Sequence, residues 1–156
     1  MERNRFKYER KMELLTIRQL DDWMTAHCYP DSYAVGNRII HEGYGLSLVD
    51  GFYDWYYTEH GERLPIQRFT AEWEAVAFSF TAITADKTAN RHLVGFMDNE
   101  TTKQALLTEL ANRRIPYRED TIPFGGLHDL KTRVFVFGCA IQRALDLQKK
   151  YGIRHP

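Results

Sequence analysis

The chain has 156 residues, of which 44% are hydrophobic, 13% aromatic and 27% charged. This size and composition are typical of a globular domain that buries its core without a disulfide or a metal, and they exclude a disordered chain. Its 21 basic and 21 acidic residues give a net charge of zero, so no overall electrostatic field would attract nucleic acid or an anionic membrane.

The ends of the chain and its two cysteines set expectations about location. Residues 1–11 hold five basic and two acidic side chains and are interpreted as a solvated, frayed arm on a single domain spanning residues 1–156. No apolar run could span a membrane and no signal-peptide core follows the arm, so we expect a cytoplasmic protein without membrane contact. Cys28 and Cys139 show no paired spacing and are predicted to be buried thiols rather than a disulfide.

A first helix is predicted from Thr16 to about Ala26. Thr16 and Gln19 have the spacing of a capping box, in which each side chain accepts a hydrogen bond from the other residue's backbone N–H. A loop over residues 29–37 and a short strand over residues 38–42 are expected to follow. The apolar side of this helix is Ile17, Leu20, Trp23 and Met24.

The dipeptide Asp50-Gly51 predicts a tight hairpin, because a type I′ turn needs positive φ at both central positions. The turn would pair Val49 with Phe52, and the register then follows residue by residue. Directly opposed residues share a face of the sheet. One face is therefore apolar, with Tyr44, Leu46, Leu48, Tyr53, Trp55 and Tyr57. The other face holds Gly45, Ser47, Asp54 and Tyr56.

A second turn at His60-Gly61 would extend this hairpin into a three-stranded antiparallel meander. The like charges of Glu59 and Glu62, which would lie opposite each other, leave a longer loop open. Pro65 cannot donate a ladder hydrogen bond, so the third strand is predicted at the sheet edge. The expected pairs are Tyr57–Leu64, Tyr56–Pro65, Trp55–Ile66 and Asp54–Gln67.

A second helix is predicted to follow Thr70 as its N-cap, with Glu72 in the first turn. Apolar residues recur at helical spacing, and we expect them to pack on the apolar face of the meander. The predicted fold class is therefore α+β, an antiparallel β-meander packed against helices in one compact domain. The expected stripe is Trp73, Val76, Ala77, Phe80 and Ile83.

The second half is predicted to continue this mixture of helices and strands. Helices are expected at residues 100–112 and 139–150, the latter ended by Gly152. The alternative of one longer helix that starts near Leu130 stays open. Strands are expected at residues 92–97, 115–119 and 132–137.

No stretch carries a complete catalytic or metal-binding motif. The six histidines have no metal-ligand spacing, and CxxC, P-loop, GxSxG and GxGxxG motifs are missing from the sequence. We therefore expect no catalytic residue, no metal and no cofactor. One alternative is a small-molecule site or an enzyme that uses the loop Gly125–Asp129, whose glycine pair could cradle a phosphate, together with His92 or His128.

Acidic residues gather between Asp50 and Glu74, where six carboxylates and two arginines leave four negative charges. Tyrosine beside acids on a rigid sheet suits a basic protein surface, because rings supply contact area and charge steers the encounter. A solvated sheet face explains the same pattern equally well. The candidate partner-binding residues are Asp54, Tyr56, Glu59, Glu62, Gln67 and Glu72.

The elements from Tyr44 onward occur in a recognisable order. A strand, a DG turn, an aromatic strand, the loop TEHGER (58–63), a short strand and the helix opening AEWEAVA (71–77) follow one another. This order, about a quarter of the chain, resembles bacterial immunity proteins of polymorphic-toxin and contact-dependent growth-inhibition (CDI) systems. The resemblance carries over no binding residue.

The resemblance implies a non-enzymatic cytoplasmic protein that binds a cognate toxin domain, commonly a nuclease, and neutralises it by stoichiometric binding. Such a protein would not contact nucleic acid directly. Two other hypotheses stay open. One is the small-molecule or enzyme site at residues 125–129, and the other is an adaptor that binds proteins through an exposed sheet edge.

Overall fold

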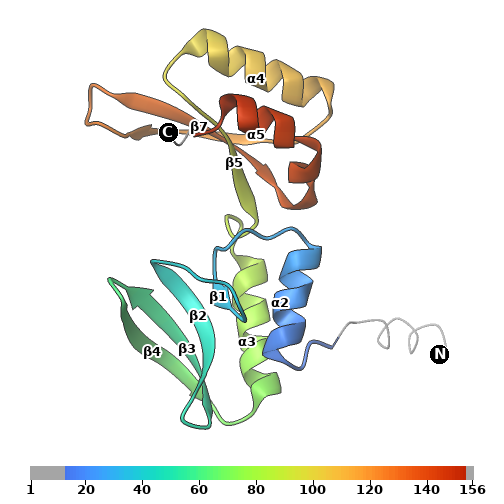
Figure 1. Cartoon of the computed structure of the whole chain (residues 1–156), viewed down its shortest axis with the longest axis vertical. Coiled ribbons are helices and arrows are strands. Elements are labelled where there is room, and N and C mark those ends of the chain that lie inside the picture. Colours follow the sequence, from blue (N-terminus) through green and yellow to red (C-terminus); the bar gives the residue numbers. More distant parts are fainter. Residues whose placement is uncertain (1–12, 154–156) are drawn as a thin grey trace, which may run out of the picture. The chain divides into compact units, whose positions relative to one another are not determined.

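The computed structural model describes residues 13–153, so the arm predicted at residues 1–11 lies outside the described residues. The described residues divide into two compact units. Unit 1 contains residues 13–25 and 31–86, and unit 2 contains residues 26–30 and 87–153. The α+β class is confirmed, with a four-stranded sheet A in unit 1 and a three-stranded sheet B in unit 2 (Figure 1). The single domain spanning residues 1–156 stays a prediction.

The first helix, α2, runs over Ile17–Ala26 as predicted. The capping box is formed in both directions: the Gln19 N–H donates to Thr16 Oγ1 at 3.1 Å, and the Thr16 N–H donates to Gln19 Oε1 at 3.1 Å. Leu20 and Met24 are fully buried on one side of the helix. Local sequence therefore sets the start of this helix.

Sheet A has the strand order β1-β2-β3-β4, with β2 at Gly43–Val49, β3 at Phe52–Glu59 and β4 at Glu62–Phe69. The β2–β3 register is confirmed along its whole length, from Val49–Phe52 to Tyr44–Tyr57. Both turns place their two central residues at positive φ, as type I′ requires. The second turn is therefore as tight as the first, and Glu59 does lie opposite Glu62.

The register of β4 is wrong beyond Pro65. A bulge adds one residue, Ile66, so that Gln67 rather than Ile66 pairs with Trp55, and Arg68 rather than Gln67 pairs with Asp54. A bulge shifts the pairing of every later residue by one position, so each side chain beyond it meets a different neighbour on the adjacent strand. The edge position of β4 is confirmed.

A further correction concerns the short strand predicted at residues 38–42. The structure instead forms β1 at Ala34–Val35, which pairs parallel with β2. Residues 38–40 have no regular structure, and Arg38 is held there by ion pairs described below.

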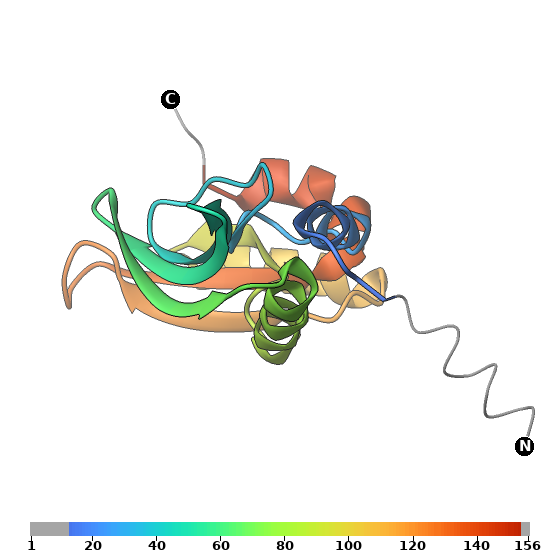
Figure 2. The same ribbon diagram turned by 90° about the horizontal axis from the view of Figure 1, so that it is seen from below.

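The second helix, α3, spans Glu72–Ala85 and lies beside α2, both seen nearly end-on in Figure 2. Its N-cap is Ala71 without a side-chain hydrogen bond, so the predicted Thr70 cap is wrong. The helix packs between two neighbours: Phe78 meets Trp55 of sheet A at a ring distance of 5.7 Å, and Phe80 meets Trp23 of α2 at 4.9 Å.

This double contact displaces the predicted stripe. Val76 and Ile83 are buried as expected, but Trp73 is 56% exposed and Ala77 is exposed as well. Ala75 and Ser79 are buried instead. A helix with neighbours on two sides buries a wider arc than one amphipathic stripe predicts.

Unit 2 has the sheet order β5-β7-β6. The helix predicted at residues 100–112 is confirmed as α4, capped by Asn99, whose side chain accepts from the Thr102 N–H. Leu130 begins a strand, so the alternative of one long helix is wrong. The strand predicted at residues 115–119 lies three residues later in the chain. The bounds are β5 Arg91–Met97, α4 Glu100–Asn112, β6 Arg118–Pro123 and β7 Leu130–Phe137.

The C-terminal helix is split rather than continuous. A 3₁₀ helix, η1, covers Gly138–Arg143, and α5 covers Leu145–Tyr151 with Gly152 as its C-cap. The core of unit 2 lies between one face of sheet B and these helices, and it includes Val94, Leu106, Leu110, Val134, Val136 and Leu147. The opposite face of sheet B carries Arg133, Phe135 and Phe137 of β7.

Cys28 and Cys139 form a disulfide within unit 2, which corrects the prediction of two free thiols. The bridge ties the short segment at residues 26–30 to η1 although the two cysteines are 111 residues apart. Sequence spacing says nothing about such a bridge, because only the folded chain brings the two Cα atoms within 5.0 Å.

Candidate functional site

Exposed rings and carboxylates meet where β3 and β4 join. Tyr57 and Leu64 are directly opposed on one face of sheet A, and Tyr44 lies on the same face across β2. Leu64 is 62% exposed and Tyr44 is 41% exposed, whereas α3 covers this face only further along, at Trp55. The rings of Tyr44 and Tyr57 lie 5.2 Å apart, edge to face.

Three carboxylates surround these side chains. Glu59 and Glu62 face each other across the turn on the same side as Tyr57. Glu42 accepts a hydrogen bond from the Tyr57 hydroxyl at 2.9 Å. This bond, burial and the nearby charges of Glu42 and Glu59 raise the pKa of Tyr57 above its usual value. We call this set the acidic aromatic patch: Glu42, Tyr44, Tyr57, Glu59, Glu62 and Leu64.

No Lys or Arg among residues 13–153 forms an ion pair with either of the two facing glutamates. Like charges directly opposite on a sheet destabilise the pair. Glu59 Oε1 lies 3.2 Å from Nε2 of the exposed His60, and Glu62 has no ion pair with residues 13–153. Local arrangements that cost stability are expected mainly at functional sites.

Asp54 does not belong to this exposed surface, contrary to expectation. Its residue is only 3% exposed, and Arg68 binds both carboxylate oxygens, with Nε–Oδ1 at 2.8 Å and Nη2–Oδ2 at 3.0 Å. The hydrogen bond from Arg68 outweighs burial and lowers the pKa of Asp54. The charge of Asp54 is therefore neutralised within sheet A.

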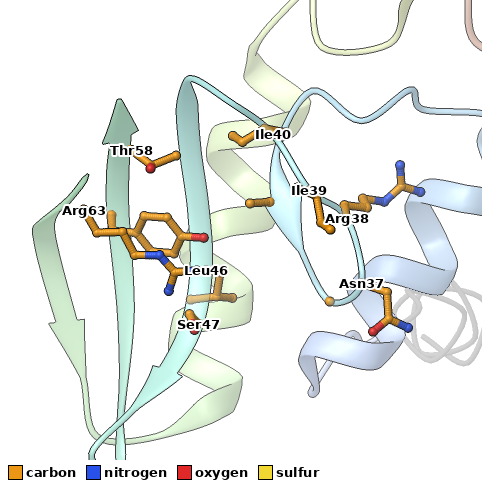
Figure 3. Close-up of a pocket in the computed structure, with 11 residues that line it drawn as sticks. Asn37, Arg38, Ile39, Ile40, Leu46, Ser47, Thr58 and Arg63 are labelled. Carbon is orange, nitrogen blue, oxygen red and sulfur yellow. The ribbon is translucent and has the colours of Figure 1, made fainter. Parts of the chain in front are cut away.

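Tyr56 is also buried, at 4% exposure, so it is not free on an outer face. Its ring lies over Gly45, where an added Cβ would come within 2.5 Å of the tyrosine oxygen. The Arg63 guanidinium covers the ring from above at 4.3 Å. Figure 3 shows Arg63 reaching across from β4 beside a hollow of about 380 Å³ that the loop at residues 36–40 closes on the other side.

The last two candidate residues have different surroundings. Glu72 accepts a hydrogen bond from the Ile17 N–H at 2.9 Å, so it closes the first turn of α2 instead of facing solvent freely. Gln67 is exposed on the edge strand opposite Trp55. Of the six predicted partner-binding residues, only Glu59 and Glu62 therefore share an exposed patch.

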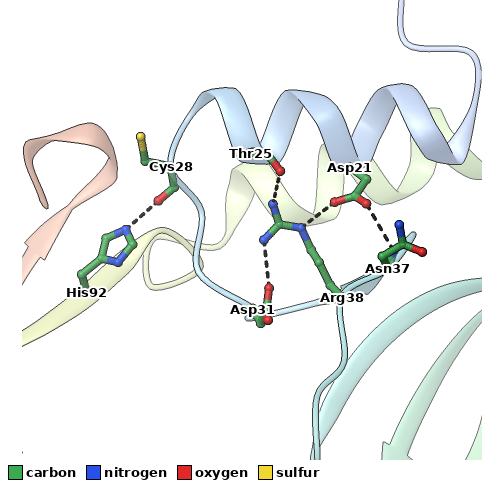
Figure 4. A network of polar contacts seen from close by, with 7 residues as sticks. All are labelled: Asp21, Thr25, Cys28, Asp31, Asn37, Arg38 and His92. Atoms are coloured by element: carbon green, nitrogen blue, oxygen red, sulfur yellow. Dashed lines mark hydrogen bonds and ion pairs between the residues drawn. The ribbon is translucent and has the colours of Figure 1, made fainter. Parts of the chain in front are cut away.

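An ion-pair network holds the loop at residues 36–40 in place, and sequence reasoning missed it. Arg38 is 8% exposed in its side chain and binds Asp21 Oδ1 at 2.9 Å, Asp31 Oδ1 at 3.2 Å and Thr25 Oγ1 at 2.9 Å (Figure 4). Asp21 also accepts from the Asn37 N–H. The network is structural, since its charges are satisfied internally.

The alternative site at Gly125–Asp129 does not include His92. His92 pairs with Val136 near one end of β7, whereas the loop precedes Leu130 at the other end. Six residues of extended strand separate them by about 20 Å. His92 Nε2 instead lies 2.6 Å from the Cys28 carbonyl oxygen (Figure 4). In the loop, Asp129 forms an ion pair with Lys131 at 3.1 Å.

The acidic bias extends over the whole of unit 1, whereas the sequence indicated it only between Asp50 and Glu74. Its described residues include twelve Asp or Glu and only four basic side chains, a net charge of −8. Two of these bases, Arg38 and Arg68, are already paired with aspartates. The described residues of unit 2 have eleven basic and seven acidic side chains, a net charge of +4.

No family model, curated protein or solved structure matches this chain. Among residues 13–153, no helix is both long enough and apolar enough to cross a bilayer. The same residues contain no group of three or more side chains that could hold a metal ion. A disulfide is typical of oxidising compartments, so the cytoplasmic location stays a prediction.

Proposed function

We propose that this chain is a non-enzymatic inhibitor, an immunity protein that binds a basic toxin domain through the acidic aromatic patch of unit 1. The observation that carries the proposal is the pair Glu59 and Glu62, held face to face beside exposed Tyr44 and Leu64 and half-buried Tyr57. The repulsion between the two glutamates destabilises the free protein. A basic partner would relieve this repulsion on binding, which would strengthen the complex.

The composition of the patch supports this proposal. Exposed rings beside charge are typical of binding hot spots, where aromatic area gives affinity and charge gives orientation and speed. The net charge of −8 on residues 13–25 and 31–86 would steer a basic surface, such as the nucleic-acid cleft of a nuclease, toward the patch. Occlusion of that cleft would neutralise the toxin.

The edge strand argues against the adaptor hypothesis of strand addition. In a two-residue hairpin the residues that flank the turn, here Glu59 and Glu62, form a hydrogen-bonded pair. Because hydrogen-bonded pairs alternate along the ladder, the backbone groups of Arg63 and Pro65 point away from β3, toward the open edge of the sheet. Pro65 offers no N–H there, and the bulge at Ile66 follows directly. Proline and bulges are devices that prevent edge pairing.

The test is co-expression with the toxin domain encoded by the gene next to this one. The double variant Glu59→Lys/Glu62→Lys should lose rescue of growth and bind the purified toxin domain at least tenfold more weakly, since tenfold is about 1.4 kcal/mol. Glu74→Lys is the control away from the patch, with half the charge change of the double variant, because Glu74 is exposed in the first turn of α3. The first turn of α3 lies beside Tyr53, at the end of β3 opposite the patch, so Glu74 is remote from the patch.

Equal affinity of both variants and the wild type would move the interface away from the patch. A neighbouring gene that encodes no toxin, combined with failure to bind any domain it encodes, would remove the proposal altogether.

A further inference from the structure

The outer face of sheet B contains a hollow of about 410 Å³ lined by three basic side chains, two carboxylates, two phenylalanines and a threonine. Three of its lining residues, Lys87, Arg91 and Arg118, form no ion pair with residues 13–153. Arg91 comes from β5 and Arg118 from β6, on either side of the central strand β7. Strands are about 4.8 Å apart, and Arg91 lies opposite Phe137 whereas Arg118 lies opposite Phe135, so the Cα atoms of the two arginines are roughly 12 Å apart.

The aromatic residue Phe135 forms the floor. Arg118 pairs directly with it in the ladder, and the Arg91 guanidinium lies 4.2 Å from the ring centre. The guanidinium of Arg133 lies 5.1 Å away from the same ring. Phe135 is only 6% exposed, so the ring holds the guanidinium groups in place but offers no free face to a ligand.

Two carboxylates line the same hollow, and both already have partners. Asp120 binds Arg133 through both oxygens, and Glu119 lies 3.8 Å from Lys103 of α4. The hydrogen bond from Arg133 lowers the pKa of Asp120, and the charge of Arg91 adds to this effect. Because Arg133 and Lys103 pair with the two carboxylates, Lys87, Arg91 and Arg118 leave this surface with a net positive charge.

We propose that this hollow binds two adjacent phosphates, as found in inorganic pyrophosphate or in a nucleoside diphosphate. Arginine forks match phosphate oxygens two at a time, and lysine adds a point charge. Arginines that approach from two different strands can each bind one phosphate of a diphosphate, and the volume suits a ligand of nucleotide size. Single-stranded nucleic acid is disfavoured, because such binding relies on exposed rings for base stacking.

The test is isothermal titration calorimetry of the full chain at fixed ionic strength with pyrophosphate, ADP and monophosphate. Binding of one pyrophosphate or ADP per chain, with monophosphate at least about tenfold weaker, is the expected result. ADP that binds more tightly than pyrophosphate would identify a nucleoside diphosphate as the ligand, and equal affinities would identify the diphosphate alone. Arg118→Gln should weaken binding about tenfold, as expected for one charge-assisted contact.

Arg118 is exposed and has no ion pair within the described chain, so its replacement should leave the melting temperature unchanged. Lys149→Gln on α5 is the matched control and should bind pyrophosphate as the wild type does. The proposal fails if no diphosphate binds, if Lys149→Gln weakens binding as much as Arg118→Gln, or if a single-stranded oligonucleotide binds while pyrophosphate does not. None of these measurements involves a toxin, so this inference stands or falls separately from the proposed function.

Discussion

Arg68 binds the buried carboxylate of Asp54 from the neighbouring strand, with Nε–Oδ1 at 2.8 Å and Nη2–Oδ2 at 3.0 Å. The two residues meet only because the bulge at Ile66 moves β4 forward by one position. Without the extra residue, Gln67 would lie opposite Asp54. One inserted residue therefore decides whether Asp54 is a surface acid or an internal one.

The first prediction follows from this pair. Arg68→Ala should lower the free energy of unfolding by about 1–3 kcal/mol, because it leaves a buried carboxylate without its donor. Asp54→Lys should also destabilise the fold, which makes it unsuitable as a probe of partner binding. Urea denaturation measures both effects.

The pH dependence of the same pair has a definite sign. The pKa of Asp54 is lowered in the folded state, so its contribution is present above the unfolded pKa of about 3.9 and is lost as the pH falls through the lower folded value. The stability difference between the wild type and Asp54→Asn should therefore shrink as the pH falls below about 4. A difference that stays constant down to pH 2 would contradict the assignment.

The second prediction separates stability from binding at the turn. Glu62→Gln removes one of two like charges that lie opposite each other, so it should stabilise the protein by about 0.2–1 kcal/mol while it weakens toxin binding. The gain should decrease in 1 M salt, where exposed charges are screened. Thermal denaturation at low and high salt measures it, and a destabilised Glu62→Gln would show that Glu62 has a structural partner.

The third prediction concerns the close approach of Tyr56 to Gly45. Gly45→Ala places a Cβ 2.5 Å from the tyrosine oxygen and 2.8 Å from the Ala34 Cβ, so the strands must shift at a cost of about 1–3 kcal/mol. Combining Gly45→Ala with Tyr56→Leu should cost less than the sum of the two single variants, because the smaller side chain removes the clash. Additive costs in this double-mutant cycle would contradict the contact.

The fourth prediction concerns the bridge between Cys28 and Cys139. Reduction, or the double variant Cys28→Ser/Cys139→Ser, should lower the free energy of unfolding by about 2–4 kcal/mol, because the bridge closes a long loop in the unfolded chain. Denaturation with and without a reductant measures this change. Two reactive thiols in the unfolded, unreduced protein would show that the bridge is not formed.

The fifth prediction is a titration. Arg113 binds both oxygens of Asp146 at 2.7 Å, and this bidentate contact lowers the pKa of Asp146 to about 2. The stabilisation that it provides is present above the ordinary aspartate pKa and is lost as the pH falls toward 2. An NMR titration should find the low pKa in the wild type and a return toward the ordinary value in Arg113→Gln.

The sequence by itself determined the features that depend on neighbouring residues. Asp50-Gly51 fixed the β2–β3 register, since a type I′ turn leaves only one alignment. Thr16 and Gln19 set the start of α2, and Asn99 the start of α4. Pro65 correctly indicated an edge strand because a missing N–H is a property of the residue alone.

Only the tertiary structure decided which of the candidate partner-binding residues are exposed. Tyr56 is covered by Arg63 and Asp54 is paired with Arg68, contacts that depend on the path of β4 and its bulge. The disulfide and the hollow lined by Arg91, Arg118 and Phe135 likewise join residues from distant parts of the chain. Turn and capping signals act within a few residues, whereas burial and charge pairing depend on segments that meet only after folding.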